Sequence, residues 1–176
     1  MIPSIPDRLK SVVHAMSDVV IPALDETNAL AQEQARLVIG QAMLLLQQLD
    51  YAAEYEALEV KAAIALGEAL LKSAAGDAKT TAAKKALKIA IATAPNDPDR
   101  RRARVSVNDA TNNLIDAAYQ DGSPSFTGSI LPVVLGHMTP ITTYERAFFM
   151  GAKFDTDAAS MPSLGEAMAA YRKAFP

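Results

Sequence analysis

Three side chains in the C-terminal third of the chain have types that suit chemistry: His137, Tyr144 and Arg146. An imidazole transfers protons near neutral pH, a phenol donates a hydrogen bond, and a guanidinium binds carboxylates. Together they predict a pocket for an apolar or carboxylate ligand, or an acid/base step. The competing interpretation is a buried histidine bonded to the backbone, because no nucleophile is identifiable near it.

The segment that leads to these residues is apolar but rich in helix breakers. Pro132, Gly136 and Pro140 interrupt it, so we expect residues 123–140 to lack regular structure and a helix to begin at Ile141 and run to Gly151. An apolar segment of this kind must be buried or must cover something. The hypothesis of a ligand pocket therefore has residues 123–146 as its lid.

Several classes of catalytic site are excluded by composition. The chain has no cysteine, which removes thiolate nucleophiles, disulfides and cysteine-ligated zinc. Neither His14 nor His137 has a glutamate three residues before it, so the di-iron type of bundle is excluded. There is no glycine-rich phosphate loop. We therefore predict no catalytic residue, no metal and no cofactor, and incline against an enzyme.

Charge is unevenly distributed along the chain, although the net charge is only −3. The first 70 residues are acidic, and the stretch from Lys72 to Arg104 is basic. A basic stretch can bind anionic ligands, but charge runs are more often solvated helix faces. Aromatic residues are not interleaved with the basic ones, so we expect no nucleic-acid binding.

The segment from Thr27 to Ala75 contains strong helix formers and no proline. The sequence leaves open whether it forms one long helix or two. Asp50 is the best candidate for a break, giving one helix over residues 28–49 and another over 51–74. The first is apolar on almost every side, which is typical of a helix buried centrally or between subunits.

Signals for the other helices are local. The first helix is predicted over Pro6–Ile21 and ends near Pro22, while Gly76-Asp77 ends one helix and starts the next. Further helices are predicted from Asp77 to Thr93, from Asp99 to Gln120 and from Ser163 to Ala174. The predicted fold class is therefore all-α: a bundle of about four long helices with two or three shorter C-terminal ones. We treat the chain as a single domain, with residues 1–122 as the bundle and residues 123–176 as a loop-rich part packed on it.

One resemblance rests on the N-terminal quarter. Asp7-Arg8-Leu9 is followed by Val19-Val20-Ile21-Pro22-Ala23-Leu24 and then by a helix rich in Ala and Leu. This order resembles the start of a small uncharacterised bacterial helical domain found near acyl-CoA dehydrogenases and aminoglycoside-phosphotransferase-like proteins. The resemblance implies genomic context only and assigns a role to no residue.

Two functional hypotheses follow. The first is a non-catalytic cytoplasmic helical protein that acts through self-association, as a homodimer or larger homo-oligomer, or through a partner interface. The second is a bundle that binds a small molecule, or acts as an enzyme, with a pocket closed by residues 123–146. No apolar stretch approaches the roughly 20 residues that span a bilayer, so we expect no membrane partner.

Overall fold

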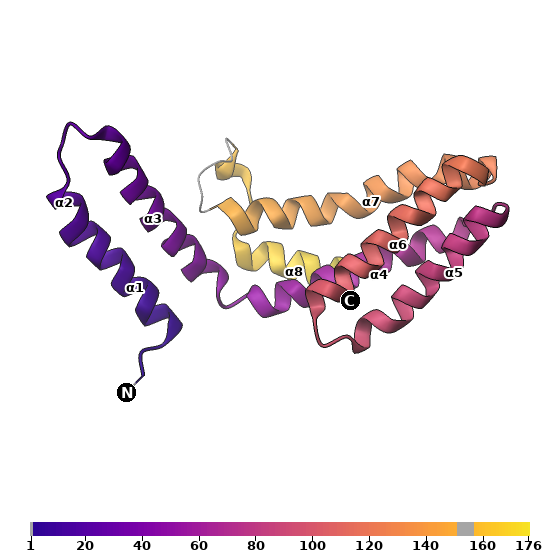
Figure 1. Cartoon of the computed structure of the whole chain (residues 1–176), viewed down its shortest axis with the longest axis horizontal. Coiled ribbons are helices and arrows are strands. Elements are labelled where there is room, and N and C mark those ends of the chain that lie inside the picture. The colour runs from indigo at the N-terminus through magenta and orange to yellow at the C-terminus, as the bar shows by residue number, and fades with distance from the viewer. Residues whose placement is uncertain (1, 151–156) are drawn as a thin grey trace. The chain divides into compact units, whose positions relative to one another are not determined.

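The computed structural model describes residues 2–150 and 157–176, and in these residues the chain forms α-helices and no β-strand (Figure 1). This confirms the predicted all-α helical bundle. The chain divides into two compact units: unit 1 is Met1–Ala52 with Glu145–Pro162, and unit 2 is Ala53–Tyr144 with Ser163–Pro176. The sequence analysis, which treats the chain as one domain, does not anticipate this division. Among the described residues, none of the helices combines the length and apolar character needed to cross a membrane.

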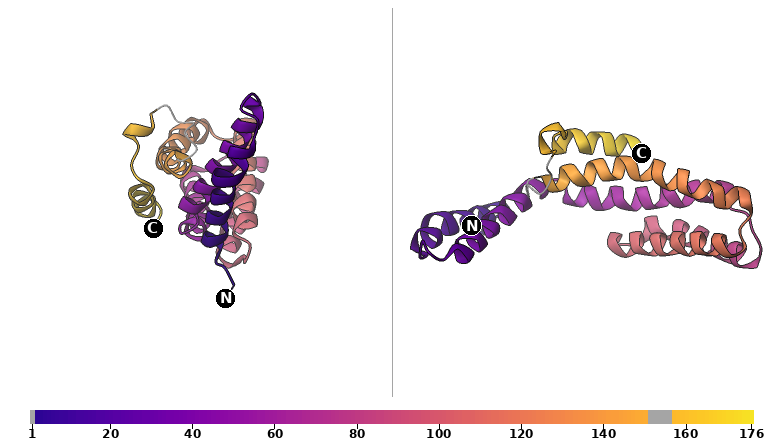
Figure 2. Two further views of the ribbon diagram at one scale, coloured as in Figure 1. Left: turned by 90° about the vertical axis from the view of Figure 1, so that its left-hand side faces the viewer. Right: turned by 90° about the horizontal axis from the view of Figure 1, so that it is seen from above.

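Unit 1 is built on two helices that lie side by side (Figures 1 and 2). Helix α1 spans Ile5–Ala15, continues through a π-helical turn at Met16–Val20, and ends in the short α2, Ile21–Ala23. After a turn, α3 spans Ala29–Gln48 and runs back along α1. The predicted helices over residues 6–21 and 28–49 are therefore confirmed to within two residues.

The helix starts of unit 1 are capped by short polar side chains. Ser4 and Asp7 form a reciprocal capping box at the start of α1, and the hydrogen bond from the Ser4 hydroxyl holds the pKa of Asp7 below its usual value. Asn28 accepts from the N–H of Ala31 at 3.1 Å at the start of α3. Asp25 instead closes the turn before α3, where it accepts from the N–H and hydroxyl of Thr27.

Unit 2 holds the remaining helices. They are α4 (Ala52–Ser73), α5 (Ala78–Thr93), α6 (Arg100–Asp121), most of α7 (Pro124–Phe149) and α8 (Leu164–Ala174). Because α3 ends at Gln48 and α4 begins at Ala52, the stretch from Thr27 to Ala75 forms two helices, with the break at Asp50 as predicted. The boundaries predicted for α4, α5, α6 and α8 are also confirmed to within two residues.

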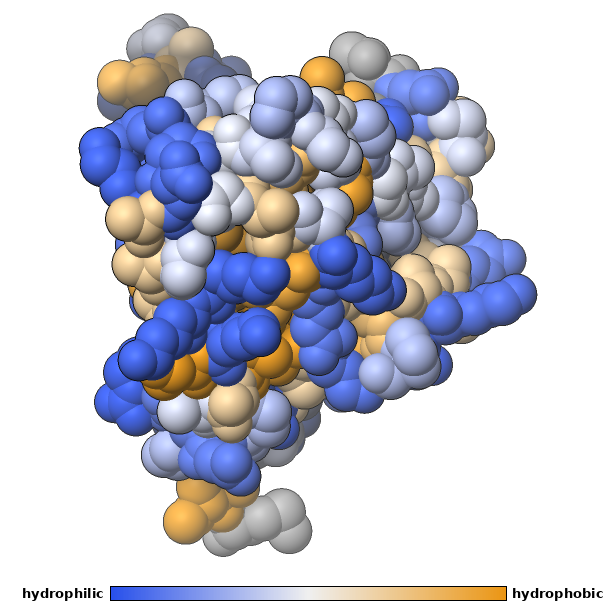
Figure 3. All heavy atoms as spheres, turned by 90° about the vertical axis from the view of Figure 1, so that its right-hand side faces the viewer, coloured by the Kyte–Doolittle hydropathy of each residue, from blue (hydrophilic) through white to orange (hydrophobic). Residues whose placement is uncertain are grey.

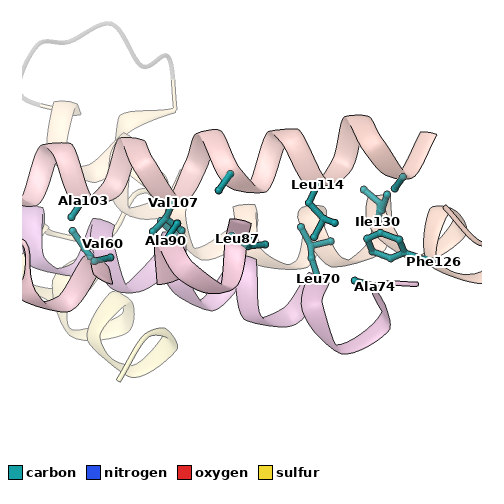
Figure 4. Packing of buried hydrophobic residues seen from close by; sticks show 14 residues of the cluster. Val60, Leu70, Ala74, Leu87, Ala90, Ala103, Val107, Leu114, Phe126 and Ile130 are labelled. Carbon is teal, nitrogen blue, oxygen red and sulfur yellow. The ribbon is translucent and has the colours of Figure 1, made fainter. Parts of the chain in front are cut away.

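Four helices of unit 2 share one hydrophobic core. Leu70 of α4, Leu87 of α5, Leu114 of α6 and Phe126 of α7 are fully buried, and Val107 lies among them. Figure 4 shows Leu70 and Leu114 pointing toward each other, with Phe126 and Ile130 beside them. Gly67 brings α4 close to α5, since a Cβ placed there would lie 2.9 Å from the Cδ1 atom of Ile91. The core thus relies on close helix approach as well as on large side chains.

The prediction that residues 123–140 lack regular structure is wrong, and so is the loop-rich character expected of this part. These residues belong to α7, a helix of 26 residues that contains Pro132 and Pro140. Each proline removes the hydrogen bond to the carbonyl four residues earlier, at Gly128 and Gly136. Both glycines are exposed, so water can reach these carbonyls, while packing of the opposite side of α7 holds the helix together. The predicted end of this helix, Gly151, lies outside the described residues.

Two loops close one end of unit 2 against each other. Gly76, between α4 and α5, and Gly122, between α6 and α7, form an isolated antiparallel bridge. The N–H of Asp77 donates to the carbonyl of Asp121 at 3.1 Å, and the N–H of Ser123 donates to the carbonyl of Ala75 at 2.9 Å. These two bonds tie both helix pairs together at this end.

The start of α5 is capped by a carboxylate from another helix. Asp77 was expected to cap it but makes no capping bond; instead the carboxylate of Asp121 accepts from the N–H groups of Lys79 and Thr80, at 2.7 and 2.9 Å. The hydroxyl of Thr80 also donates to Asp121, at 2.6 Å, and this bond is the main reason that the pKa of Asp121 lies below its usual value. The cap adds a third link between α5 and the end of α6.

We expect Asp121→Asn to lower the thermal unfolding midpoint by a few degrees at pH 7, because the amide cannot reproduce the charged cap. A carboxyl whose pKa is lowered by folding stabilises the folded state above its unfolded pKa, about 3.9, and this contribution is lost as pH falls through the folded pKa. The difference from wild type should therefore shrink below about pH 4. Asp116→Asn, on the exposed side of the same helix, is the matched control and should change little at any pH. A constant difference from pH 7 to pH 3 would argue against the cap.

Candidate functional site

Three tyrosines from three helices form a stacked column in unit 2. The ring of Tyr144 on α7 lies between Tyr55 of α4, with ring centroids 5.2 Å apart, and Tyr171 of α8, at 4.7 Å. The Tyr144 and Tyr171 rings are nearly parallel, with 7° between their planes, and both residues are buried. Stacking of this kind adds to the burial of aromatic surface, so the column docks α8 onto α7.

His137 lies on the same side of α7 as Tyr144, two turns earlier. Its ring centroid is 6.1 Å from that of Phe175, which in turn packs edge-on against Tyr171. Its Nδ1 atom is 3.3 Å from the carbonyl oxygen of Val133 on its own helix. The ring is half-buried, and it bonds to the backbone as the competing interpretation expects.

Arg146, the third predicted site residue, belongs to unit 1. It is exposed, and its Nη2 atom lies 4.0 Å from the Oδ2 atom of Asp157. The structure therefore brings His137 and Tyr144 into one aromatic cluster with Phe175 and Tyr171. Arg146 follows Tyr144 by two residues on α7, and its described ion pair is with Asp157 rather than with this cluster.

The aromatic column gives a test of whether these residues serve stability. Tyr171→Ala should cost about 3–5 kcal/mol of unfolding free energy, because it removes a buried ring stacked on Tyr144. His137→Ala should cost less than about 1 kcal/mol, since its ring is half-buried and its bond is local. Denaturant unfolding followed by circular dichroism measures both. Equal losses in the two variants would contradict the structural role assigned to the column.

Most of the basic side chains in the middle of the chain are bonded within unit 2. Arg104 pairs with Glu59, which also accepts from the hydroxyl of Tyr55 at 3.0 Å. Other bonded side chains of the basic stretch are Lys79, Lys84, Arg100 and Arg102, with Gln120, the Ala74 carbonyl, the Ala53 carbonyl and Asp97 as acceptors. This favours the interpretation of the basic stretch as a helix surface with local partners, and the absence of nucleic-acid binding stays a prediction.

The described surface has hollows that open to solvent. A groove of about 600 Å³ lies between α5 and α6, with Ile89 and Val105 among its lining residues and Arg102 and Asp109 beside them. A second, of about 470 Å³, lies at the turn between α2 and α3 and is lined by Ile21, Leu24 and Arg36 among others. On the face seen in Figure 3, hydrophobic side chains likewise reach the surface between hydrophilic ones. Within the described ranges, no three carboxylate or imidazole groups gather as they would to hold a metal ion.

The largest departure from ordinary burial is in unit 1. No residue of α1 is buried, and Leu44 is the one large hydrophobic residue buried in positions 2–52, whereas ten are exposed. Other apolar residues there, such as Leu9, Val13 and Ile39, are half-buried. The exposed ones are Ile2, Ile5, Val12, Val19, Val20, Leu30, Leu37, Val38, Met43 and Leu45. Positions 2–52 therefore leave ten large hydrophobic side chains exposed.

Much of this apolar surface lies on one side of the α1–α3 pair. At about 100° per residue, Leu30, Leu37, Val38 and Leu45 share an arc of roughly 100° on α3. The exposed Gln34 and Gln41 and the buried Gln48 fall in the same arc, which lies between the buried Ala35 and Ala42 on one side and the buried Leu44 on the other. On α1, Ile5 and Val12 are likewise offset to one side of the half-buried residues. Because the two helices run antiparallel, both offsets point to the same side of the pair.

The π-helical turn decides which residue continues this stripe. A π-turn accommodates one residue more than an α-turn, which moves Val20 rather than Val19 into line with Ile5 and Val12. Val19 is accordingly the more exposed of the two, at 66% against 37%. We call the resulting surface the hairpin face; its residues are Ile5, Val12, Val20, Leu30, Leu37, Val38 and Leu45.

The hairpin face is visible in the sequence only in part. The all-round apolar character of α3 predicts that it is buried centrally or between subunits, and within the described chain only Ala35, Ala42, Leu44 and Gln48 of this helix are buried. Gln48 donates from Nε2 to the carbonyl of Phe148 at 2.9 Å, which covers the last turn of α3 alone. On α1 the apolar residues Leu9, Val12, Val13 and Met16 recur at steps of three and four, which predicts one apolar face, but the sequence does not show that part of it stays uncovered.

Compared with known proteins, the chain matches no protein-family model, no curated protein and no solved structure. The resemblance of the N-terminal quarter to a bacterial helical domain accordingly stays an expectation.

Proposed function

We propose that this chain is a non-catalytic helical protein that acts through self-association, and that the hairpin face is the surface that associates. The observation that supports the proposal is the ratio of exposed to buried large hydrophobic residues in positions 2–52 of unit 1, ten side chains against one. Two packed helices have only one shared surface, and a stable helical domain needs a further layer to cover the remaining apolar stripe. A second copy can supply that layer.

The size of the hairpin face suits this role. Its seven aliphatic side chains are between 37% and 68% exposed. They present on the order of several hundred Å² of apolar surface, which is the upper range for a monomer and a large part of the roughly 800 Å² that one partner buries in a standard interface. The face lacks charged residues, as the core of an interface does, and its exposed polar side chains on α3 are Gln34 and Gln41.

The alternative function, a small-molecule or enzymatic pocket closed by residues 123–146, has less support. It depends on an irregular lid, and this segment is a helix whose Phe126, Ile130 and Tyr144 are buried. What still favours a ligand is His137, half-buried beside the aromatic column. We rank this alternative below self-association because the segment expected to form its lid is a regular helix with buried residues.

Thermal unfolding at several protein concentrations tests the proposal. If the folded state is a dimer and the unfolded chain is a monomer, the midpoint must rise with concentration by mass action. We expect a rise of several degrees between about 1 and 100 µM, followed by circular dichroism at 222 nm or by tyrosine fluorescence. A midpoint that does not change over this range would contradict self-association.

A further inference from the structure

We infer that two copies pack their hairpin faces together as a four-helix bundle, related by a two-fold axis that runs across the helices. In this arrangement α1 lies against α1 of the partner and α3 against α3. This inference rests on the proposed self-association and adds its geometry. The occupant of the face is a second copy of the same face, because seven aliphatic residues without a charge fit an isologous, two-fold interface.

Only two face-to-face arrangements have two-fold symmetry. Each hairpin has a turn end, where α2 leads into α3, and an open end, where α1 begins and α3 ends. If the axis runs along the helices, the turn ends of both hairpins meet, and α1 lies opposite α3 of the partner. If the axis runs across the helices, each turn end meets the open end of the other hairpin, and α1 lies opposite α1. All neighbouring helices are antiparallel in both cases, so helix packing does not choose between them.

The distribution of charge along the hairpin favours the second arrangement, with the axis across the helices. The turn half of the hairpin carries Asp18, Asp25, Glu26 and Glu33 against one basic residue, Arg36, whereas the open end carries Arg8 and Lys10. The acids of the open end, Asp7 and Asp50, balance these two, so that end has no net charge. An axis along the helices would gather eight carboxylates and two guanidinium groups, four and one from each copy, at one end of the dimer, and this excess of like charge is repulsive. The crossed axis keeps the two acidic turns apart and sets each beside Arg8 and Lys10 of the partner.

The absence of cysteine makes disulfide cross-linking a direct test. Val12 is the central residue of the α1 stripe and falls near the crossed axis, so Val12→Cys should cross-link to itself in the dimer. With the crossed axis, Ile5 of one copy lies opposite Val20 of the other. The two Ile5 residues of the dimer are then about 20 Å apart along the helix, and so are the two Val20 residues, whereas a disulfide needs Cα atoms within about 7 Å. Ile5→Cys and Val20→Cys should therefore fail to cross-link alone and cross-link when mixed.

Matched variants identify the opposite result. Ser11→Cys, on the polar side of α1, should not cross-link and reports random collisions. A mixture of Ile5→Cys and Leu45→Cys cross-links only if the axis runs along the helices, because both residues lie at the open end. We expect at least tenfold more cross-linked dimer for Val12→Cys than for Ser11→Cys under mild oxidation, analysed on non-reducing gels.

The outcomes separate this inference from the proposed function. Cross-linking of Ile5→Cys with Leu45→Cys would overturn the arrangement in which α1 lies against α1 of the partner. A dimer in which no hairpin position cross-links would overturn it too. Neither result contradicts self-association. If the cysteine-free chain is a monomer in the same buffer, both are overturned. Cross-linking at Val12, and of Ile5→Cys only with Val20→Cys, supports the arrangement.

Discussion

Replacing Leu37 with glutamate is expected to convert the purified chain from a dimer into a monomer. Leu37 lies in the middle of the hairpin face and is 44% exposed in the single chain. In the dimer the carboxylate would be buried without a partner, which should weaken association by about 100-fold or more, or about 3 kcal/mol. Glutamate is as good a helix former as leucine, so α3 should remain helical. Sedimentation velocity at several concentrations measures the change.

The control for this prediction is Gln47→Glu, which adds the same charge to the opposite, polar side of α3. It should leave the dimer intact. If Leu37→Glu and Gln47→Glu associate equally well, the hairpin face is not the interface. If both variants become monomers, net charge rather than burial governs association.

Gly122→Ala is expected to lose about 3 kcal/mol of unfolding free energy, which corresponds to roughly 6–12 °C in the melting midpoint. A Cβ atom at this position would lie 2.5 Å from the carbonyl oxygen and 2.8 Å from the Cα of Ala118. These are backbone atoms, so the clash cannot be relieved by a side-chain rotation. The loop must move, and the paired bonds between Asp77 and Asp121 and between Ser123 and Ala75 would be strained or lost.

Gly40→Ala is the matched control. A Cβ at Gly40 meets nothing within 4 Å, and alanine is favoured over glycine in a helix interior by about 1 kcal/mol. Gly40→Ala should therefore melt slightly above wild type while Gly122→Ala melts well below it. The same midpoint for all three proteins would mean that the two loops do not need the close approach seen at Gly122.

Much of the fold was predictable because its signals are local. Asn28 caps α3, Gly76 ends α4, Pro95 and Pro98 separate α5 from α6, and Ser163 caps α8. Each of these residues acts on its own helix terminus, so the sequence alone is sufficient to find the boundary.

Helix α7 was missed because its local and long-range preferences disagree. Pro132 and Pro140 weaken a helix, but Phe126, Ile130, Tyr144 and Ala147 are buried along one side of it. Burial of that side decides the conformation, and the preference of each residue for a helix or a loop is overridden. The segment does contain apolar residues three and four apart, among them Phe126, Ile130 and Val134, and this spacing is compatible with a helix.

The contacts that define the candidate sites join residues far apart in the sequence. The column of Tyr55, Tyr144 and Tyr171 and the cap that Asp121 places on α5 have no local signature. By contrast, the apolar excess of α3 was readable, because a helix without a polar side needs more than one neighbour. The sequence does not indicate that α1 covers only part of α3.

The mass of the wild-type chain in solution is the most direct test of self-association. A single chain has a mass of 18.7 kDa, so a dimer has twice that value, 37.4 kDa. Light scattering coupled to size-exclusion chromatography, at tens of micromolar and near neutral pH, should give at least the dimer mass. A single species of 18.7 kDa at that concentration would contradict the account.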